Sequence, residues 1–299
     1  MDVQDLKVFE AVARHGGMKR AAEELATVQS NVTARIRALE EDLEVRLFDR
    51  HSRGVVLTSA GERLLPYAQR AAVLMTDARR AARDDGHPSG SLVVGSLETT
   101  AALHLSRPLA AYVAAHREVD LVLRTGTTAE LIQRVLTGEL EGSFVCGPVA
   151  HPELEVETVY HEELVLVAPP GLGAIEALSA RREVRIVVLR AGCSYRQRLE
   201  EILARRGIVG LRILEFGTIE AIVGSVAAGL GVTLLPRGIV AAAEAEGRVE
   251  LHRLPPEDGL VETLFIRRVD GHSSSALTAL IATVADPAVA RPALVAAAE

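Results

Sequence analysis

The stretch MKRAAEELATVQSNVTARIRALEEDL, residues 18–43, decides the fold of the first part of this chain. It predicts a helix over about 18–25, a short turn around residues 26–27, and a second helix over about 29–43. Apolar residues recur along the second helix at spacings of four and three, which places them on one face: Val32, Ile36, Leu39 and Leu43. That face predicts close packing against neighbouring helices.

The residues before this stretch predict a further helix over about 3–14. Its apolar residues also follow helical spacing: Leu6, Phe9, Val12 and Ala13. Gly16 and Gly17 end this helix, because glycine favours backbone conformations that interrupt a helix. The 18–25 helix contributes its own inward residues to the same small core: Ala21, Ala22 and Leu25.

The opposite face of the 29–43 helix carries hydrogen-bonding and cationic side chains: Gln29, Ser30, Asn31, Thr33, Arg35 and Arg37. A recognition helix needs such side chains, because its N-terminal residues enter the major groove of DNA. Arginine forms two hydrogen bonds with guanine, and asparagine or glutamine forms two with adenine. Acidic residues gather at the far end of the helix, where they would point away from phosphate: Glu40, Glu41, Asp42 and Glu44. The alternative is a plain three-helix bundle with solvated charges.

Residues 45–58 predict a wing, which is two short strands about a turn that contains Gly54. Arg50 and Arg53, with His51, lie near the predicted tip, where contact with phosphate or the minor groove is geometrically natural. We therefore expect Arg50 and Arg53 to contact nucleic acid. A surface ion pair is the alternative for Arg50, and for Arg46 both readings stay open. The acids that would form such pairs are Glu44 and Asp49.

A long helix is predicted over about 59–84. Ser59 and Glu62 form a capping-box pattern, in which serine is the N-cap and glutamate is the third helical residue. Apolar residues along this helix alternate spacings of four and three, as in a coiled-coil seam: Leu64, Ala68, Ala71, Met75, Ala78 and Ala82. We expect the first five of these to join two copies of the chain. The alternative is a helix packed against its own domain.

Residues 84–90 read DDGHPSG and are the clearest linker in the chain. The sequence therefore predicts a winged helix-turn-helix over 1–58, a dimerisation helix over 59–85, a hinge over 86–90, and a second region over 91–299.

Residues 18–50 strongly resemble the helix-turn-helix of LysR-type transcriptional regulators. The matching words are RAAEEL at 20–25, QSNVTARIRALEE at 29–41 and LFDR at 47–50, followed by LTSAGE at 57–62. Their order and spacing are highly specific. The resemblance extends, more loosely, over residues 91 to about 285.

The resemblance implies a winged helix-turn-helix, a dimer through the linker helix that is often a dimer of dimers, and a periplasmic-binding-protein-like effector domain of two α/β lobes. The chain departs from the family at Gly17, where serine is frequent, at Met18, where an aromatic residue is frequent, and at Ala34 and Arg35, where Arg-Gln is common. These departures bear on the register of base contacts more than on the fold. The tail after about Asp286 matches no pattern of the family.

From Ser91 onward, predicted strands and helices alternate, which favours a parallel α/β fold. The first half predicts strands at 92–94, 119–124 and 144–146, and helices over about 99–116 and 129–137. The second half predicts strands at 185–189, 211–215 and 232–235, and helices that end near Gly207 and Gly229. Each half contains a strand followed by glycine, threonine and a helix, at residues 125–127 and 216–218. Two similar halves fit a two-lobed domain with a cleft between the lobes.

Ligands of such sheets bind at the carboxyl ends of strands, beside helix N-termini. Hydroxyls and one thiol are predicted there: Ser96, Thr99, Thr100, Thr127, Thr128, Cys193, Ser194 and Thr218. Helix N-termini expose free N–H groups and a partial positive charge, which favours an anionic effector. The alternative is that each hydroxyl only caps its helix. By resemblance, Ser96 and Thr127 match positions that often touch effector in this family.

Two cysteines, Cys146 and Cys193, lie far apart in the sequence and near the same predicted edge. A redox switch, as in peroxide-sensing relatives, is one reading, and two small buried residues are the other. The chain shows no CxxC pattern, and its start is acidic and polar, so we expect reduced thiols, no signal peptide and a cytoplasmic protein. No apolar run is long enough to span a membrane.

Composition and motifs exclude several function classes. The formal net charge of -7 argues against a protein coated in basic residues, although a local basic surface suffices for binding DNA. No dinucleotide loop, P-loop, GxSxG or HExxH motif is present, and the nine histidines form no metal pattern. We therefore expect neither an enzyme nor a cofactor or metal. A solute-binding protein is opposed by residues 1–60.

These observations predict a regulator that binds double-stranded DNA as a homodimer, and further as a tetramer, with activity modulated by a small molecule. RNA polymerase is a further candidate partner. The effector, the target genes and the sign of regulation are not encoded in any motif of the sequence.

Overall fold

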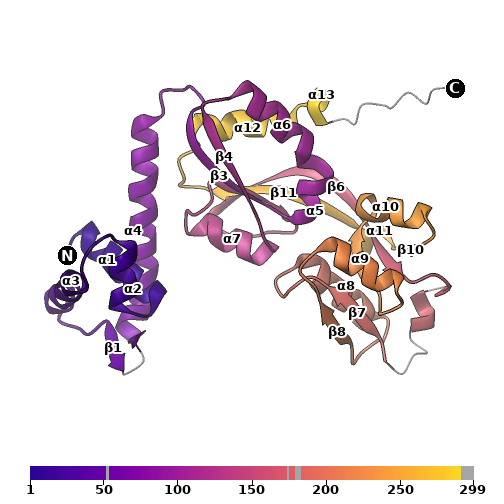
Figure 1. The fold of residues 1–299 in the computed structure, drawn as a ribbon, viewed down its shortest axis with the longest axis horizontal. Helices are drawn as coiled ribbons and strands as arrows, with labels where there is room; N and C mark the ends of the chain where they lie inside the picture. The colour runs from indigo at the N-terminus through magenta and orange to yellow at the C-terminus, as the bar shows by residue number, and fades with distance from the viewer. Residues whose placement is uncertain (52–53, 174, 179–182, 291–299) are drawn as a thin grey trace. The chain divides into compact units, whose positions relative to one another are not determined.

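The structure is a computed structural model that describes residues 1–51, 54–173, 175–178 and 183–290 (Figure 1). The chain divides into two compact units, residues 1–83 and residues 84–299, so the division falls at the first residue of the predicted linker. Each unit has a hydrophobic core of its own.

Unit 1 begins with three helices, α1 (Val3–His15), α2 (Met18–Glu24) and α3 (Gln29–Asp42). Their bounds agree with the predicted helices to within one residue. The apolar faces meet in one core, in which Phe9, Ile36 and Leu39 are fully buried. The ring of Phe9 lies 5.2 Å from the ring of Phe48, which begins the wing.

The wing of unit 1 consists of β1 (Phe48–His51) and β2 (Gly54–Leu57), paired antiparallel. It docks on the end of α1, where the backbone N–H of Val55 donates to the carbonyl of Gly16 at 3.1 Å. Gly54 has φ +140°, and a Cβ there would lie 2.6 Å from the Gly16 oxygen. Glycine is therefore required at residue 54 both for this backbone conformation and for the close approach.

α4 (Ser59–Arg83) follows the wing and begins within one residue of the predicted start. The predicted cap is wrong by one position: the hydroxyl of Thr58, and not that of Ser59, accepts from the backbone N–H of Gly61 at 3.1 Å. The Thr58 hydroxyl also donates to the carbonyl of Arg46 at 2.7 Å, which ties the start of α4 to the start of the wing. Because Thr58 also bonds to Arg46, which is distant in the sequence, Thr58 and not Ser59 is the residue that caps α4.

The predicted seam of α4 divides between two roles. Ala68 is fully buried in the core of unit 1 and Leu64 packs against that core, so both follow the alternative reading, a contact within their own domain. Met75 and Ala78 are exposed and Ala71 is half-buried. The apolar residues that α4 exposes most are Tyr67 and Leu74, with 67% and 65% of their surface accessible.

Unit 2 contains two lobes (Figure 1). Lobe 1 is a sheet in which β3 (Gly90–Ser96) pairs in parallel with β4 (Val119–Thr125) and β5 (Gly142–Cys146). A continuous helical run lies beside it: α5 (Glu98–Thr100), a π-helical turn (Ala101–Leu105) and α6 (Ser106–Ala115). The other helices of lobe 1 are α7 (Thr128–Leu136), α12 (Ser275–Ala285) and α13 (Pro287–Ala290). The hydroxyl of Tyr112 on α6 donates to the carbonyl of Ala276 on α12 at 2.8 Å.

Lobe 2 repeats the alternation of strands and helices. β7 (Arg185–Val188) pairs in parallel with β8 (Arg212–Glu215), and Ile186 bridges in parallel to Val232. The remaining elements of this lobe are the short 3-10 helix (Ile175–Leu178), α8 (Ser194–Arg205), α9 (Ile219–Ala227), β9 (Thr233–Pro236), α10 (Arg237–Ala245), β10 (Glu250–Arg253) and α11 (Pro256–Gly259).

Two long strands join the lobes, and the expectation of a purely parallel fold is wrong for them. β6 (Leu154–Ala168) and β11 (Leu260–Arg268) pair antiparallel with each other, and β11 pairs antiparallel with β5. The sheet order is β10-β6-β11-β5-β3-β4, with β9 on β6. β6 is a 15-residue strand whose first half is mostly exposed and whose last five residues are buried. Two antiparallel crossing strands form a natural hinge between the lobes.

Candidate DNA interface and ligand cleft

α3 presents a polar face away from the core of unit 1. Gln29, Ser30, Asn31 and Arg37 are exposed, and Thr33 is half-buried. The amide of Asn31 donates to the hydroxyl of Thr27 at 3.0 Å, which holds this side chain beside the turn. The predicted recognition face is therefore accessible along the first two and a half turns of α3.

Arg35 differs from the rest of that face. Its guanidinium donates to the Asp5 carboxylate of α1 at 2.7 Å and lies 3.8 Å from the Asp2 carboxylate. Asp2 and Asp5 also form the capping box of α1. Arg35 thus holds α3 against the start of α1, a role that the periodicity of α3 alone did not indicate. The sequence signal for it was the pair of acids at the start of the first helix.

Glu40 has a structural role that its position among acids did not suggest. One oxygen of its carboxylate accepts from the backbone N–H groups of Leu47 and Phe48, at 2.8 and 3.2 Å. These bonds fix the start of the wing relative to α3. The sequence placed Glu40 with the acids at the far end of the helix, and the structure adds this role in holding the wing.

A hollow of about 460 Å³ with a lining of mixed charge lies between α3 and the wing. It is lined by two arginines, a histidine, two acids and an aromatic ring: Arg37, Arg46, His51, Glu40, Asp49 and Phe48. Among the described residues no ion pair joins Arg46 to Glu44 or Asp49. The side chain of Arg50 and the whole of Arg53 lie outside the described residues, so their predicted contacts stay predictions.

In unit 2 a cavity of about 250 Å³ lies between the two lobes. It is at the carboxyl ends of β3, β4 and β7, the edge that the sequence predicted. Its lining residues come from both lobes: Leu97, Glu98, Thr99, Thr125, Gly126 and Thr127 from lobe 1, and Leu189, Arg190, Cys193, Tyr195, Phe216 and Gly217 from lobe 2. We call this cavity the cleft.

Three of the eight predicted effector residues line the cleft, namely Thr99, Thr127 and Cys193. The others neighbour it. Ser96 is fully buried and its hydroxyl donates to the carbonyl of Leu97 at 2.9 Å. Thr218 caps α9 by accepting from the N–H of Ala221 at 3.3 Å. The remaining three, not among the lining residues, are Thr100, Thr128 and Ser194.

Thr127 combines the two roles that the sequence allowed for it, because its hydroxyl caps α7 and the residue also lines the cleft. Its hydroxyl accepts from the N–H of Glu130 at 3.3 Å, and the Glu130 carboxylate accepts from the N–H of Thr127 at 2.9 Å. This second bond holds the pKa of Glu130 below its usual value. Prediction from sequence missed seven lining side chains: Leu97, Glu98, Thr125, Leu189, Arg190, Tyr195 and Phe216. Each lies within four positions of a residue that was predicted.

Three hydrogen bonds between described residues join the lobes across the cleft. The hydroxyls of Thr99 and Tyr195 share a hydrogen bond of 3.3 Å. The N–H of Ala129 donates to the carbonyl of Gly192 at 3.4 Å. The guanidinium of Arg190 donates to the Glu130 carboxylate at 3.1 Å. Burial raises the pKa of Tyr195 well above its ordinary value, so this hydroxyl stays neutral and keeps its proton for hydrogen bonding.

Both cysteines are buried free thiols. Burial raises the pKa of Cys146 to about 12 and also raises the pKa of Cys193. The thiolate is the reactive form, so both side chains have the character of small buried residues and not of a redox sensor.

We expect the native protein to resist alkylation by iodoacetamide at pH 8, because burial raises the pKa of both thiols and so keeps them protonated. In guanidinium chloride both thiols should react within the ordinary time for free cysteine. Mass spectrometry of the alkylated protein is the measurement. Rapid labelling of one cysteine in the native protein would restore the redox reading for that residue.

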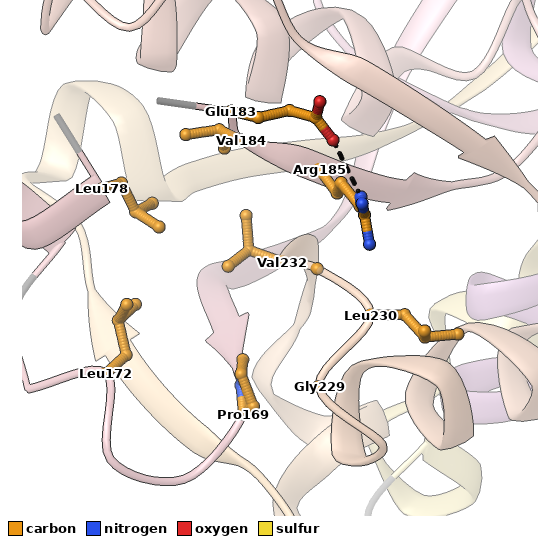
Figure 2. Close-up of a pocket in the computed structure, with 10 residues that line it drawn as sticks. Pro169, Leu172, Leu178, Glu183, Val184, Arg185, Gly229, Leu230 and Val232 are labelled. Atoms are coloured by element: carbon orange, nitrogen blue, oxygen red, sulfur yellow. Dashed lines mark hydrogen bonds and ion pairs between the residues drawn. The ribbon is translucent and has the colours of Figure 1, made fainter. Parts of the chain in front are cut away.

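A second, smaller hollow of about 180 Å³ lies within lobe 2 (Figure 2). Leu172, Leu178 and Val232 converge on it. At its edge the Arg185 guanidinium donates to the Glu183 carboxylate at 3.1 Å, so both charges already have partners. None of the predicted effector residues lines this hollow, which leaves the cleft as the place where they gather.

The described residues contain neither a metal-binding cluster nor a helix that could span a membrane. No group of three or more potential metal ligands occurs among the described residues. Within the same part of the chain, every helix is too short or too polar to bridge a lipid bilayer.

Comparison with known proteins yields two matching families. The bacterial regulatory helix-turn-helix protein, lysR family, matches residues 3–62, and the LysR substrate binding domain matches residues 85–288. The transcriptional regulator GltR of Bacillus subtilis is 43% identical over 286 residues, which are 96% of this chain and 97% of that protein. YofA of the same species is 44% identical over 276 residues, 92% of this chain and 95% of that protein. A full-length OxyR variant from Pseudomonas aeruginosa has the same fold, with a TM-score of 0.67, 21% identity, and coverage of 98% and 97% of the two chains.

Proposed function

Because this chain belongs to the LysR family of DNA-binding transcriptional regulators, we propose that unit 1 reads a specific operator, that α4 joins two copies, and that the cleft of unit 2 binds the effector. The family consists of transcriptional regulators and not of enzymes. The observation that carries the effector assignment is the cavity between the lobes, which gathers polar side chains from both lobes at the carboxyl ends of their strands.

For DNA, we assign base reading to the exposed face of α3 and backbone contact to the wing. Arg37 is the cation on that face without an ion pair among the described residues, so it is our first choice for a guanine contact. The accompanying polar residues are Gln29, Ser30, Asn31 and Thr33. Arg50 and Arg53 are assigned to phosphate or the minor groove. Arg35 is assigned to positioning α3 through Asp5.

For assembly, we assign the dimer contact to the exposed apolar face of α4. Tyr67, Ala71, Leu74 and Ala78 follow one another at spacings of four, three and four, which is the repeat of a coiled-coil seam. Two symmetry-related copies would present their recognition helices to successive major grooves, about 34–36 Å apart. We further propose that two such dimers form a tetramer and that RNA polymerase is a partner on the promoter, in the cytoplasm where bacterial DNA lies.

For regulation, the effector acts by binding one arrangement of the lobes more tightly than another, since a ligand shifts an equilibrium only by its differential affinity. The crossing strands β6 and β11 are the elements that would flex. The first turn of α8 and the Arg190 guanidinium both favour an anionic group on the ligand. By reciprocity, an effector that changes the affinity for DNA must have its own affinity changed equally by DNA.

The test is fluorescence anisotropy with a labelled duplex from upstream of the protein's own gene, against a scrambled duplex, at several salt concentrations. We expect selective binding that weakens with salt, with a slope of about 0.9 per phosphate contact. Selection of bound duplexes from a random pool covers the case of an operator elsewhere. Failure to select any sequence over the random pool would overturn the assignment of α3.

A further inference from the structure

The cleft carries one ionised side chain of each sign, and the two come from opposite lobes. Glu98 belongs to lobe 1, in the first turn of the helical run that begins after Leu97. Arg190 belongs to lobe 2, just beyond the end of β7. Both side chains line the cavity. A ligand that spans the cleft therefore meets an acid on one wall and a base on the other.

Glu98 is partly buried, and among the described residues its carboxylate has neither a hydrogen bond nor an ion pair. Its nearest neighbours in sequence are buried, and Thr99 already shares its hydroxyl with Tyr195. The Glu98 carboxylate faces the cavity without a cationic partner, so a cationic hydrogen-bond donor on a ligand can form a charge-assisted hydrogen bond with it. Glu98 is thus an unfilled acceptor at the wall of the cleft.

Arg190 is available to a ligand despite its ion pair. The guanidinium side chain is 59% exposed and donates to Glu130 at 3.1 Å. An exposed pair of this kind contributes little, and Glu130 keeps its bond from the backbone N–H of Thr127 if Arg190 leaves. A ligand carboxylate can therefore recruit Arg190 at small cost.

The lobe-2 wall around Arg190 favours an anion for a second reason. α8 is a 12-residue helix whose N-cap, Cys193, makes no side-chain hydrogen bond to the first turn. Cys193 and Tyr195 both line the cleft, so the positive end of the helix dipole faces the same cavity. Arg190 and the start of α8 thus place positive charge on the lobe 2 wall, and Glu98 places a carboxylate on the lobe 1 wall.

The size of the cleft limits the ligand. A cavity of about 150 Å³ accommodates benzene, so one of about 250 Å³ suits roughly ten non-hydrogen atoms. Apolar side chains complete the lining between the two charges: Leu97, Leu189 and Phe216. Such a lining accepts a short side chain of moderate polarity.

We infer that the effector is a small zwitterion of the α-amino acid class, with its ammonium group on Glu98 and its carboxylate on Arg190 and the first turn of α8. This inference rests on the proposed function, which places the effector in the cleft. It adds to the proposed function that the effector carries a positive group, recognised by Glu98, as well as the negative group. Both lobes then bind the same molecule, which draws them together around the β6–β11 hinge.

The experiment is isothermal titration calorimetry of the full-length protein with each protein-forming L-amino acid, followed by the 2-hydroxy acid that matches each binder. We expect at least one amino acid to bind, and its hydroxy analogue, which lacks the ammonium group, to bind about 10- to 150-fold more weakly. E98Q should lower the affinity for the amino acid by a similar factor and leave the affinity for the hydroxy acid within twofold of the wild-type value.

Glu220 provides the matched control, since it is also an acid in the first turn of a helix but is exposed and does not line the cleft. E220Q should leave both affinities unchanged. Equal binding of amino acid and hydroxy acid to the wild type would overturn the inference while leaving the effector cleft in place. Absence of binding by every amino acid would also overturn it. The proposed function fails separately, through the DNA selection described above.

Discussion

Replacing Leu74 by aspartate is expected to dissociate the dimer. Leu74 exposes 65% of its surface on α4, in line with Tyr67 and Ala78. Burial of a leucine side chain contributes about 1.5–3 kcal/mol, and a twofold interface contains the change twice. The loss of roughly 3–6 kcal/mol corresponds to a hundred-fold or greater rise in the dimer dissociation constant. Sedimentation velocity over a range of protein concentrations measures it.

Thr76 supplies the control for this variant. It is exposed on the opposite side of α4, two residues further along, and its hydroxyl donates to the carbonyl of Ala72 at 3.0 Å. T76D introduces the same charge and should leave the dimer intact. Circular dichroism of both variants checks that α4 remains helical. If L74D sediments as the wild type does at every concentration, the exposed face of α4 is not the dimer contact.

Replacing Arg37 by alanine is expected to weaken operator binding about 5- to 150-fold and to relax discrimination at one base pair. A good bidentate contact between arginine and guanine contributes about 1–3 kcal/mol to discrimination. Arg37 is exposed on α3 and lines the hollow beside the wing, so its guanidinium is free to reach DNA. The measurement is fluorescence anisotropy with the selected operator and its single-base variants.

Two further variants separate base reading from other effects of arginine. R79A removes an exposed arginine near the C-terminal end of α4 and should leave the affinity unchanged. R35A should lower affinity less than R37A, because the partly buried pair of Arg35 with Asp5 positions α3 without reading a base. If R35A abolishes discrimination and R37A has no effect, the direct contact belongs to Arg35.

Periodicity predicted the local structure well, because it is a property of neighbouring residues. The apolar stripe of Val32, Ile36 and Leu39 set the bounds and the inward face of α3, and all three are buried. Gly16 predicted the end of α1 and adopts φ +62° there. In unit 2, the alternation of apolar strands with capped helices located the edge at which the cleft lies. Thr127, Thr99 and Cys193 could therefore be placed at that edge from the sequence.

The tertiary structure alone decided which distant residues meet. Arg35 pairs with Asp5, Thr58 bonds to Arg46, and Ala68 enters the core of unit 1. Each of these contacts depends on how two elements pack, which no periodicity within one element encodes.

The same holds for the cleft. By itself, the sequence determined a winged helix-turn-helix, a long helix and a two-lobed α/β region with hydroxyls at its strand ends. Only the fold brought Glu98 and Arg190, 92 positions apart, to one cavity, because β6 carries the chain from lobe 1 into lobe 2 and the antiparallel strand β11 returns it. Charge complementarity across a cleft is a long-range property, and it exists only once the chain has closed on itself.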